Sequence, residues 1–229
     1  MVVSAIVLPW ATGLTVVLLA VGLWWSLFVA PPDYQQGETV RIMFIHVPNA
    51  SLSMVVYSFM AVASIFSLIW RHSLADVAAK SAAPIGAVFT LLALVTGSLW
   101  GKPMWGTWWE WDARMTSVLV LFFMYLGYIA LWQMIEDPIK AARAAAILAI
   151  VGFINVPIIK FSVDWWNTLH QPASLLRVGG PSIHSSMLTP LLIMMAAFGM
   201  IFFVLQLAAM RAEITRQRVR AIQLAQTEA

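Results

Sequence analysis

The 229-residue sequence contains no cysteine, and this absence excludes several kinds of chemistry at once. The chain cannot form a disulfide, cannot hold an iron–sulfur cluster through thiolates, and has no Cys-x-x-Cys-His site for covalent haem attachment. Any porphyrin that it binds must therefore be held noncovalently or through another residue type.

Charged residues are also scarce. They make up 10% of the sequence, whereas 62% of the residues are hydrophobic and the mean hydropathy is +0.86. A soluble domain carries about a quarter charged residues, so the sequence predicts an integral membrane protein surrounded by lipid, and we expect no nucleic-acid partner. No Gly-x-x-x-x-Gly-Lys-Ser/Thr run is present, so an associated ATPase would have to be another chain.

Long apolar runs are abundant, and six of them approach the roughly 20 residues that cross a bilayer. They cover residues 6–30, 47–70, 84–100, 115–135, 143–161 and 184–209. The runs are continuous and not alternating, which favours helices over a barrel. We therefore predict an all-α integral membrane protein with six transmembrane helices in a single domain, 1–229. Pro84 would begin the third helix, and Asn155 and Pro157 predict a bend in the fifth.

Lysine and arginine are distributed unevenly between the two sets of connections. One set carries eight of them: Arg71, Lys80, Lys140, Arg143, Arg211, Arg216, Arg218 and Arg220. The opposite set carries five: Arg41, Lys102, Arg114, Lys160 and Arg177. The positive-inside rule then places both termini in the cytoplasm. The polar segment 210–229 is predicted to be a cytoplasmic helical tail that extends the last span.

Tryptophan is concentrated in residues 100–114, which join the third and fourth spans on the outer face. Five of the twelve tryptophans lie there: Trp100, Trp105, Trp108, Trp109 and Trp111. A tryptophan ring in a loop must be buried or bind something. Interface belts usually scatter their tryptophans, so the cluster favours a binding surface for a flat, apolar ligand, with a belt as the alternative.

Two histidines flank this segment at the outer ends of spans, His46 in the second and His184 in the sixth. Neutral imidazole binds iron well, so the pair predicts axial ligation of a noncovalent haem, with the tryptophans stacked on the porphyrin. Candidate cations for the propionates are Arg41, Lys102, Arg114 and Arg177. The alternative for each histidine is a helix cap or a bond to a neighbouring carbonyl.

His170, in the second outer loop (162–183), follows Trp165 and Trp166. It could be a third or replacement ligand, and it ranks below the other two because a loop residue is less rigidly placed. The alternative is that Trp165 and Trp166 are interface-belt residues and that His170 is solvated. Asp112 and Glu110 could orient a ligand histidine. The sequence favours instead that one of these carboxylates pairs with Arg114.

The run Trp105-Gly-Thr-Trp108-Trp109-Glu-Trp111-Asp112-Ala-Arg114 resembles the WWD signature of haem-handling proteins in cytochrome c maturation. Within that group it is most similar to the CcmC family, haem exporter protein C. Three other segments agree: Phe44-Ile-His46-Val-Pro-Asn-Ala, Trp165-Trp166-Asn-Thr-Leu-His170-Gln-Pro and Ser182-Ile-His184. The resemblance covers nearly the whole chain.

The resemblance implies a protein of the bacterial inner membrane that is not an enzyme. Such proteins hold haem b noncovalently at the periplasmic face, here between His46 and His184. The neighbouring WWD residues would be Trp105, Trp108, Trp109, Trp111, Asp112 and Arg114. The haem is presented to the chaperone CcmE, and the ABC transporter subunits CcmA and CcmB and the small protein CcmD are further partners.

Two other functions remain possible from the residues alone. A structural membrane subunit of an ABC-type exporter would need no haem site of its own, but it would favour ionisable residues within the spans. A b-type electron-transfer cytochrome would need histidines at mid-membrane, and none of the four histidines falls there.

Overall fold

The computed structural model describes residues 2–171, 174–175 and 179–227, which excludes Arg177, one of the candidate propionate partners. The helices are α1 (Val2–Trp24) with a π-helical turn η1 (Trp25–Val29), a 3-10 turn η2 (Glu38–Ile42), α2 (Met43–Trp70), α3 (Ser73–Trp105), α4 (Ala113–Met134), α5 (Pro138–Gly152), α6 (Asn155–Trp165) and α7 (Ser185–Thr227). Within the described residues, the only strand-like pairing is an isolated bridge between Asp33 and Gly37. Six segments are long and apolar enough to cross a membrane, which confirms the predicted all-α architecture.

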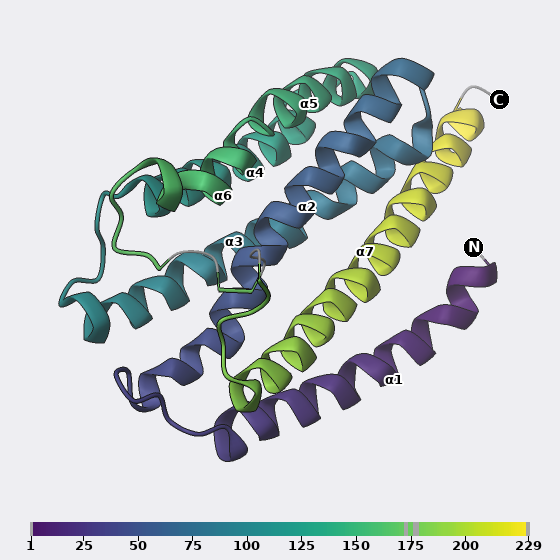
Figure 1. Ribbon diagram of the computed structural model, residues 1–229. Coiled ribbons are helices and arrows are strands. Elements are labelled where there is room, and N and C mark those ends of the chain that lie inside the picture. The colour runs from purple at the N-terminus through teal and green to yellow at the C-terminus, as the bar shows by residue number, and fades with distance from the viewer. Residues whose placement is uncertain (1, 172–173, 176–178, 228–229) are drawn as a thin grey trace.

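The α2–α3 hairpin is central, with α4, α5 and α6 on one side and α1 and α7 on the other (Figure 1). Two glycines allow this close packing. A Cβ on Gly86 would lie 2.3 Å from Cε1 of Tyr125, and one on Gly152 would lie 2.1 Å from the hydroxyl oxygen of Tyr57. Both tyrosine side chains are fully buried in the main core cluster. The absence of a side chain at the two glycines thus makes room for the largest buried residues.

The third span is longer than predicted, because α3 begins at Ser73 and contains Pro84 in its interior. The prediction that Pro84 starts the helix is therefore wrong. The first turns of α3 are rich in alanine and add little hydrophobicity, but Ala79, Ala82 and Ala83 are buried in the main core cluster. Small side chains at these positions let α3 pack closely along α2, and this tertiary packing outweighs the local preference of proline for a first turn.

The predicted bend in the fifth span is confirmed as a break between α5 and α6. Pro157 has no amide hydrogen, so it cannot donate to the carbonyl of Phe153, which accepts instead from Val156 N at 3.0 Å. The side chain of Asn155 donates to Ser117 O of α4 at 2.8 Å. A buried amide in an apolar bundle is tolerated here because it finds this partner.

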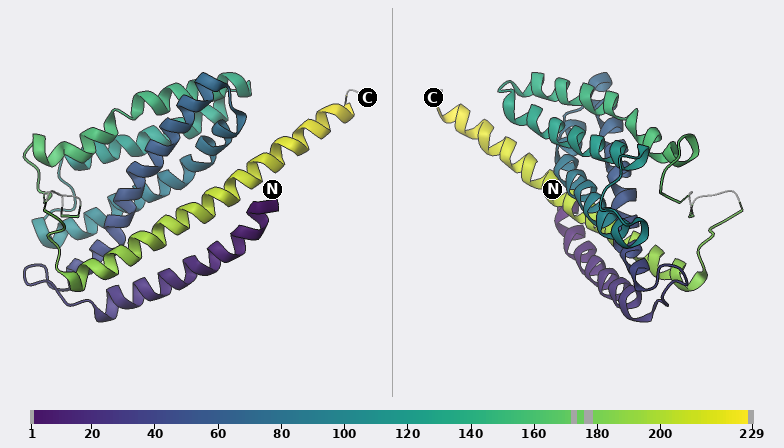
Figure 2. Two further views of the ribbon diagram at one scale, coloured as in Figure 1. Left: turned by 45° about the vertical axis from the view of Figure 1, so that its right-hand side comes forward. Right: turned by 90° about the vertical axis from the view of Figure 1, so that its left-hand side faces the viewer.

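α7 is one continuous helix of 43 residues that projects beyond the bundle at its C-terminal end (Figure 2). The predicted helical extension of the last span is confirmed, while its cytoplasmic side stays a prediction. Glu213 ties this part of α7 to α3 through an ion pair with Lys80, with 2.6 Å between Nζ and Oε1. The same ammonium lies 4.6 Å from the ring centroid of Trp132 in α4. The root of the tail is therefore fixed to the bundle.

Candidate functional site

One end of the bundle brings together most of the candidate residues. The start of α2, the end of α3, the start of α4 and the loop after α6 all lie at this end, because successive spans run antiparallel (Figure 1). His72, between α2 and α3, lies at the opposite end. It therefore takes no part in the site.

His46 lies in the first turn of α2 and is partly buried. Its Nδ1 is 3.0 Å from Oγ1 of Thr96 in α3, and that hydroxyl donates its own hydrogen to Leu92 O at 2.6 Å. The hydroxyl must therefore accept from His46, so the imidazole carries its hydrogen on Nδ1. Nε2 is left with a free lone pair, as a metal ligand requires. The ring also meets the edge of Trp100, with 5.7 Å between centroids.

His170 is held in the same way by a different acceptor. Its Nδ1 lies 3.0 Å from Oδ2 of Asp112, so a carboxylate fixes the hydrogen on Nδ1 and again leaves Nε2 free. The His170 side chain is only 19% exposed, and its ring centroid is 4.9 Å from that of Trp105. The alternative of a solvated ring is therefore wrong, because Asp112 and Trp105 hold the imidazole from two sides.

Burial lowers the pKa of His170 below 6.5, against the opposing effect of the hydrogen bond and the charge of Asp112. The imidazole is therefore neutral at pH 7. The neutral form is the one that binds a metal.

Asp112 uses both of its oxygens. Oδ1 accepts the backbone N–H of Met115 at 2.7 Å and so caps the N-terminus of α4, while Oδ2 accepts from His170. The carboxylate is buried, with 8% of the residue exposed. One side chain thus joins the tryptophan segment to the second outer loop.

Arg114 does not form the predicted ion pair with a neighbouring carboxylate. Within the described parts of the chain, no ion pair joins it to Asp112 or Glu110, and it donates instead to Ser162 Oγ at 3.2 Å and to Lys160 O at 3.4 Å. The predicted pair is therefore wrong, because the guanidinium is directed to the Ser162 and Lys160 acceptors of α6 instead. Arg114 therefore links the start of α4 to α6.

The two imidazoles lie against the same end of α3. His46 meets the edge of Trp100, and His170 meets the edge of Trp105, five residues further along the chain. Two histidines on different elements are thus brought to one end of the bundle. Each donates its Nδ1 hydrogen to a protein acceptor, which leaves the lone pair of the ring on Nε2.

The tryptophans beside these histidines differ in exposure. Trp105 packs on His170, whereas Trp108 and Trp111 are 55% and 74% exposed. Trp109 meets the edge of Trp111 at 5.4 Å between centroids, and its Nε1 is buried without an acceptor among the described residues. A buried, unpaired donor is uncommon. The segment therefore presents exposed aromatic faces together with one N–H that lacks a partner.

His184 is in a different setting. It is exposed just before α7, its Nδ1 lies 2.8 Å from Ser186 Oγ, and the backbone N–H of Ser186 donates to Nδ1 at 3.3 Å. An Nδ1 that accepts a hydrogen bond places the hydrogen of the neutral ring on Nε2. No contact in the described parts of the structure joins His184 to His46 or to the tryptophan segment.

Thr96 is the contributing residue that the sequence analysis missed. Its hydroxyl sets the position of the hydrogen on His46, yet a threonine inside an apolar run carries no motif. One signal was available. Thr96 lies four residues before Trp100 in α3, so the two share a helix face directed toward His46.

Fold and site together define a six-span helical membrane protein with a tryptophan-rich, two-imidazole site at one end of the bundle. A family model described as "Heme exporter protein C" matches residues 1–225. The chain belongs to this heme exporter protein C (CcmC) family, as its sequence motifs predicted.

Curated relatives with the same printed name agree with this assignment. The protein of Bradyrhizobium diazoefficiens is 66% identical over 97% of this chain and 84% of its own length. The protein of Haemophilus influenzae is 50% identical over 91% and 85%, and that of Escherichia coli K12 is 53% identical over 80% and 74%.

Proposed function

We propose that this protein binds haem noncovalently at the outer end of its bundle and presents it to a haem chaperone for c-type cytochrome biogenesis. The observation that carries the proposal is the shared state of His46 and His170. Each ring gives its Nδ1 hydrogen to a protein acceptor, Thr96 Oγ1 or Asp112 Oδ2, and keeps Nε2 free. The name of the relatives, heme exporter protein C, supports the same role.

The geometry favours His46 and His170 as the axial pair. Both rings are partly buried, and both meet the edge of a tryptophan in the C-terminal part of α3. His184, the partner predicted from sequence, is exposed, and its Nδ1 is bonded to its own helix start. The pair of His46 with His184 remains the alternative.

The other residues of the site fit a porphyrin. When bound, haem supplies an iron that coordinates two imidazole nitrogens. Trp108 and Trp111 offer exposed faces for its apolar surface, and the buried Trp109 N–H, which has no acceptor among the described residues, would reach a propionate only if the tryptophan segment shifted to uncover it. Arg114 is the best-placed cation for the second propionate. Lys102 is a weaker candidate, because its ammonium donates to Gly106 O at 3.0 Å.

The remaining predicted cation, Arg41, is less suitable than Arg114. Its guanidinium donates to Ser26 O at 2.8 Å and also pairs with Glu38. The first contact reaches back to η1 and the second lies within η2, so Arg41 joins these two turns ahead of α2.

A site at the end of the bundle leaves one edge of the porphyrin accessible to a second protein. We propose CcmE as that partner, with the ABC subunits CcmA and CcmB and the small protein CcmD as further components. The proposed location is the bacterial inner membrane, with both termini in the cytoplasm. The chain's own part is to hold, orient and release haem, which is handling and not enzymatic turnover.

The test is an absorption spectrum of the detergent-purified chain with haem, compared among single His→Ala variants at positions 46, 170, 184 and 72. We expect a low-spin spectrum in the wild type that is lost or converted to high spin at positions 46 and 170. Position 72, at the opposite end, is the control and should change nothing.

Three results would contradict the proposal in different ways. Loss of the low-spin spectrum in His184→Ala, with a normal spectrum in His170→Ala, would support His46 and His184, the pair predicted from sequence. Normal spectra in all four variants would exclude histidine ligation. A wild type that binds no haem would leave the chain as a structural subunit of an exporter.

A further inference from the structure

Two hollows meet at Arg211, at the end of the bundle opposite the tryptophan segment. One, of about 460 Å³, lies between α1 and α7 and is lined by Ala5, Leu8, Pro9, Ala208 and Arg211. The other, of about 820 Å³, runs along α7 past Arg211, Thr215, Arg216, Val219 and Arg220. The first is apolar apart from the guanidinium, and the second is basic. Arg211 is the residue common to both.

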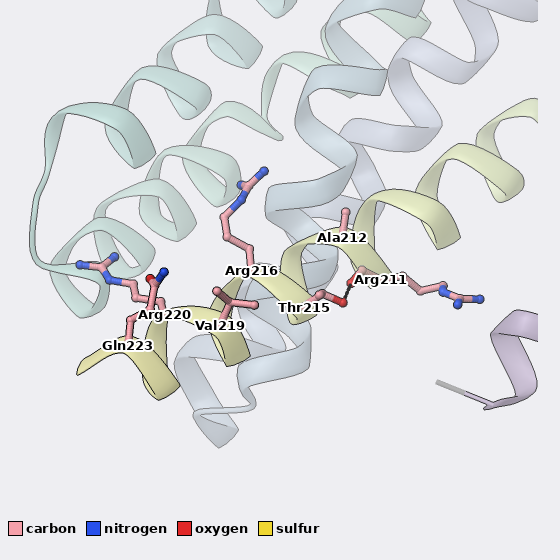
Figure 3. A pocket seen from close by; sticks show the side chains of 7 residues that line it. All are labelled: Arg211, Ala212, Thr215, Arg216, Val219, Arg220 and Gln223. Atoms are coloured by element: carbon pink, nitrogen blue, oxygen red, sulfur yellow. Dashed lines mark hydrogen bonds between the residues drawn. The ribbon is translucent and has the colours of Figure 1, made fainter. Parts of the chain in front are cut away.

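The arginine side chains that line the two hollows extend from α7 in different directions. In Figure 3, Arg211 extends toward the N-terminal end of α1, whereas Arg216 and Arg220 extend to the other side of the helix. Thr215 donates to Arg211 O at 2.9 Å, so its hydroxyl keeps a lone pair but has no hydrogen to offer. The guanidinium of Arg211 is therefore the principal donor at the mouth of the α1–α7 hollow.

The positive charge of Arg211 is not neutralised by the protein. Arg216 pairs with Glu213 at 2.9 Å, and the same carboxylate binds Lys80. No carboxylate pairs with Arg211 or Arg220 in the part of the chain that the structure describes. Arg211, a residue of intermediate burial beside an apolar wall and without a counter-ion among the described residues, is suited to an anion that has an apolar portion.

The position of Arg211 across the bilayer indicates that this anion is a lipid headgroup. Along α7 it lies about 39 Å from Ser185, at 1.5 Å per residue. A bilayer with its headgroup layers is about 40–45 Å thick, so this guanidinium is at headgroup level when Ser185 is at the opposite surface. Ala208 is one helical turn deeper, beside Leu8 and Pro9 of α1. The apolar hollow therefore lies at the depth of the upper acyl chain.

We propose that the α1–α7 hollow binds one anionic phospholipid, with its phosphate on Arg211 and the start of an acyl chain against Ala208, Leu8 and Pro9. An arginine fork binds a phosphate through two parallel hydrogen bonds. Basic pockets between spans are a known way to recognise anionic headgroups. The site is separate from the haem site and does not depend on the proposed function.

The test is native mass spectrometry of the full chain, released from micelles that contain phosphatidylglycerol or, in parallel, phosphatidylcholine. We expect one retained phosphatidylglycerol in the wild type and at least about fivefold less in Arg211→Gln, since one arginine at the surface contributes roughly that factor. Arg218→Gln is the matched control, because it removes the same charge from α7 outside both hollows. A second variant, Ala208→Phe, keeps the charge and fills the apolar half, and it should also lose the lipid.

Several outcomes would overturn this inference. Equal retention of the two lipids would show that the phosphate charge is not recognised. Equal losses of phosphatidylglycerol in Arg211→Gln and Arg218→Gln would show that retention depends on the overall charge of the chain and not on a site at Arg211. Normal retention in both Arg211→Gln and Ala208→Phe would exclude the site, provided that gel filtration and circular dichroism show both variants folded.

Discussion

Asp112→Asn separates the structural role of this carboxylate from its role in the proposed haem site. In the wild type two donors point at two oxygens, Met115 N–H at 2.7 Å and His170 Nδ1–H at 3.0 Å. Asparagine has one acceptor oxygen, so one donor must lose its partner. A backbone N–H cannot relocate its hydrogen, whereas an imidazole can. The oxygen therefore stays on the cap, and His170 moves its hydrogen to Nε2.

The expected loss of folding stability is smaller than the expected loss of haem affinity. Asparagine caps a helix about as well as aspartate, so the free energy of unfolding should fall only by the lost charge at the N-terminus of α4, about 0.3–1 kcal/mol. An Nε2 that carries hydrogen cannot coordinate iron. Loss of such a supporting carboxylate typically weakens metal binding by about 10–100-fold, which corresponds to roughly 1.4–2.8 kcal/mol.

The assay is haem titration of the detergent-purified chain by Soret absorbance, with thermal unfolding followed by circular dichroism. Asp137→Asn is the matched control, because Asp137 caps α5 at the opposite end with no histidine attached, accepting from Ile139 N at 2.8 Å. Unchanged haem affinity in Asp112→Asn would refute the assignment of the Nε2 lone pair. Equal losses of affinity in both variants would trace the effect to helix capping.

Further predictions concern other contacts of the bundle. Thr96→Val removes the acceptor of the His46 Nδ1 hydrogen, and haem affinity should fall up to about tenfold; a wild-type titration would contradict this role. Gly86→Ala places a methyl group against the Tyr125 ring, so the free energy of unfolding should fall by about 1–3 kcal/mol, measured by thermal unfolding, and an unchanged melting temperature would show that the core can relax. Trp108→Ala should leave membrane insertion intact but weaken the complex of haem, this chain and the chaperone in co-purification; normal chaperone loading would reduce the tryptophans to an interface belt.

Much of the fold could be predicted because a bilayer imposes length and polarity on every span. The six apolar runs, the break near Pro157 and the helical tail follow from these constraints. The start of α3 does not, since an alanine-rich turn looks neutral in sequence. It becomes helical because Ala79 and Ala82 pack into the core.

The contacts of the candidate residues could be predicted only in part. Tryptophan density and the histidines at the ends of spans predict a site at one end of the bundle, and the pair of His46 with His184 stays a prediction. Sequence position alone does not show that Asp112 holds His170, because such a long-range bond leaves no local signal. For the same reason the bond from Arg114 to Ser162 of α6 could not be predicted.

The break between α5 and α6 divides the fifth span into two mechanical parts. Short-range bonds such as Ile154 N to Val151 O at 3.2 Å replace regular helical bonds there, and an interrupted helix bends more easily than a continuous one. The outer part, α6, leads directly into the loop that carries His170, and Arg114 is its brace to α4. Moving α6 would carry His170 with it while α5 stays packed. Because α6 also contributes Ile159 to the main core cluster, such a movement has to break that packing together with the Arg114 contact to Ser162.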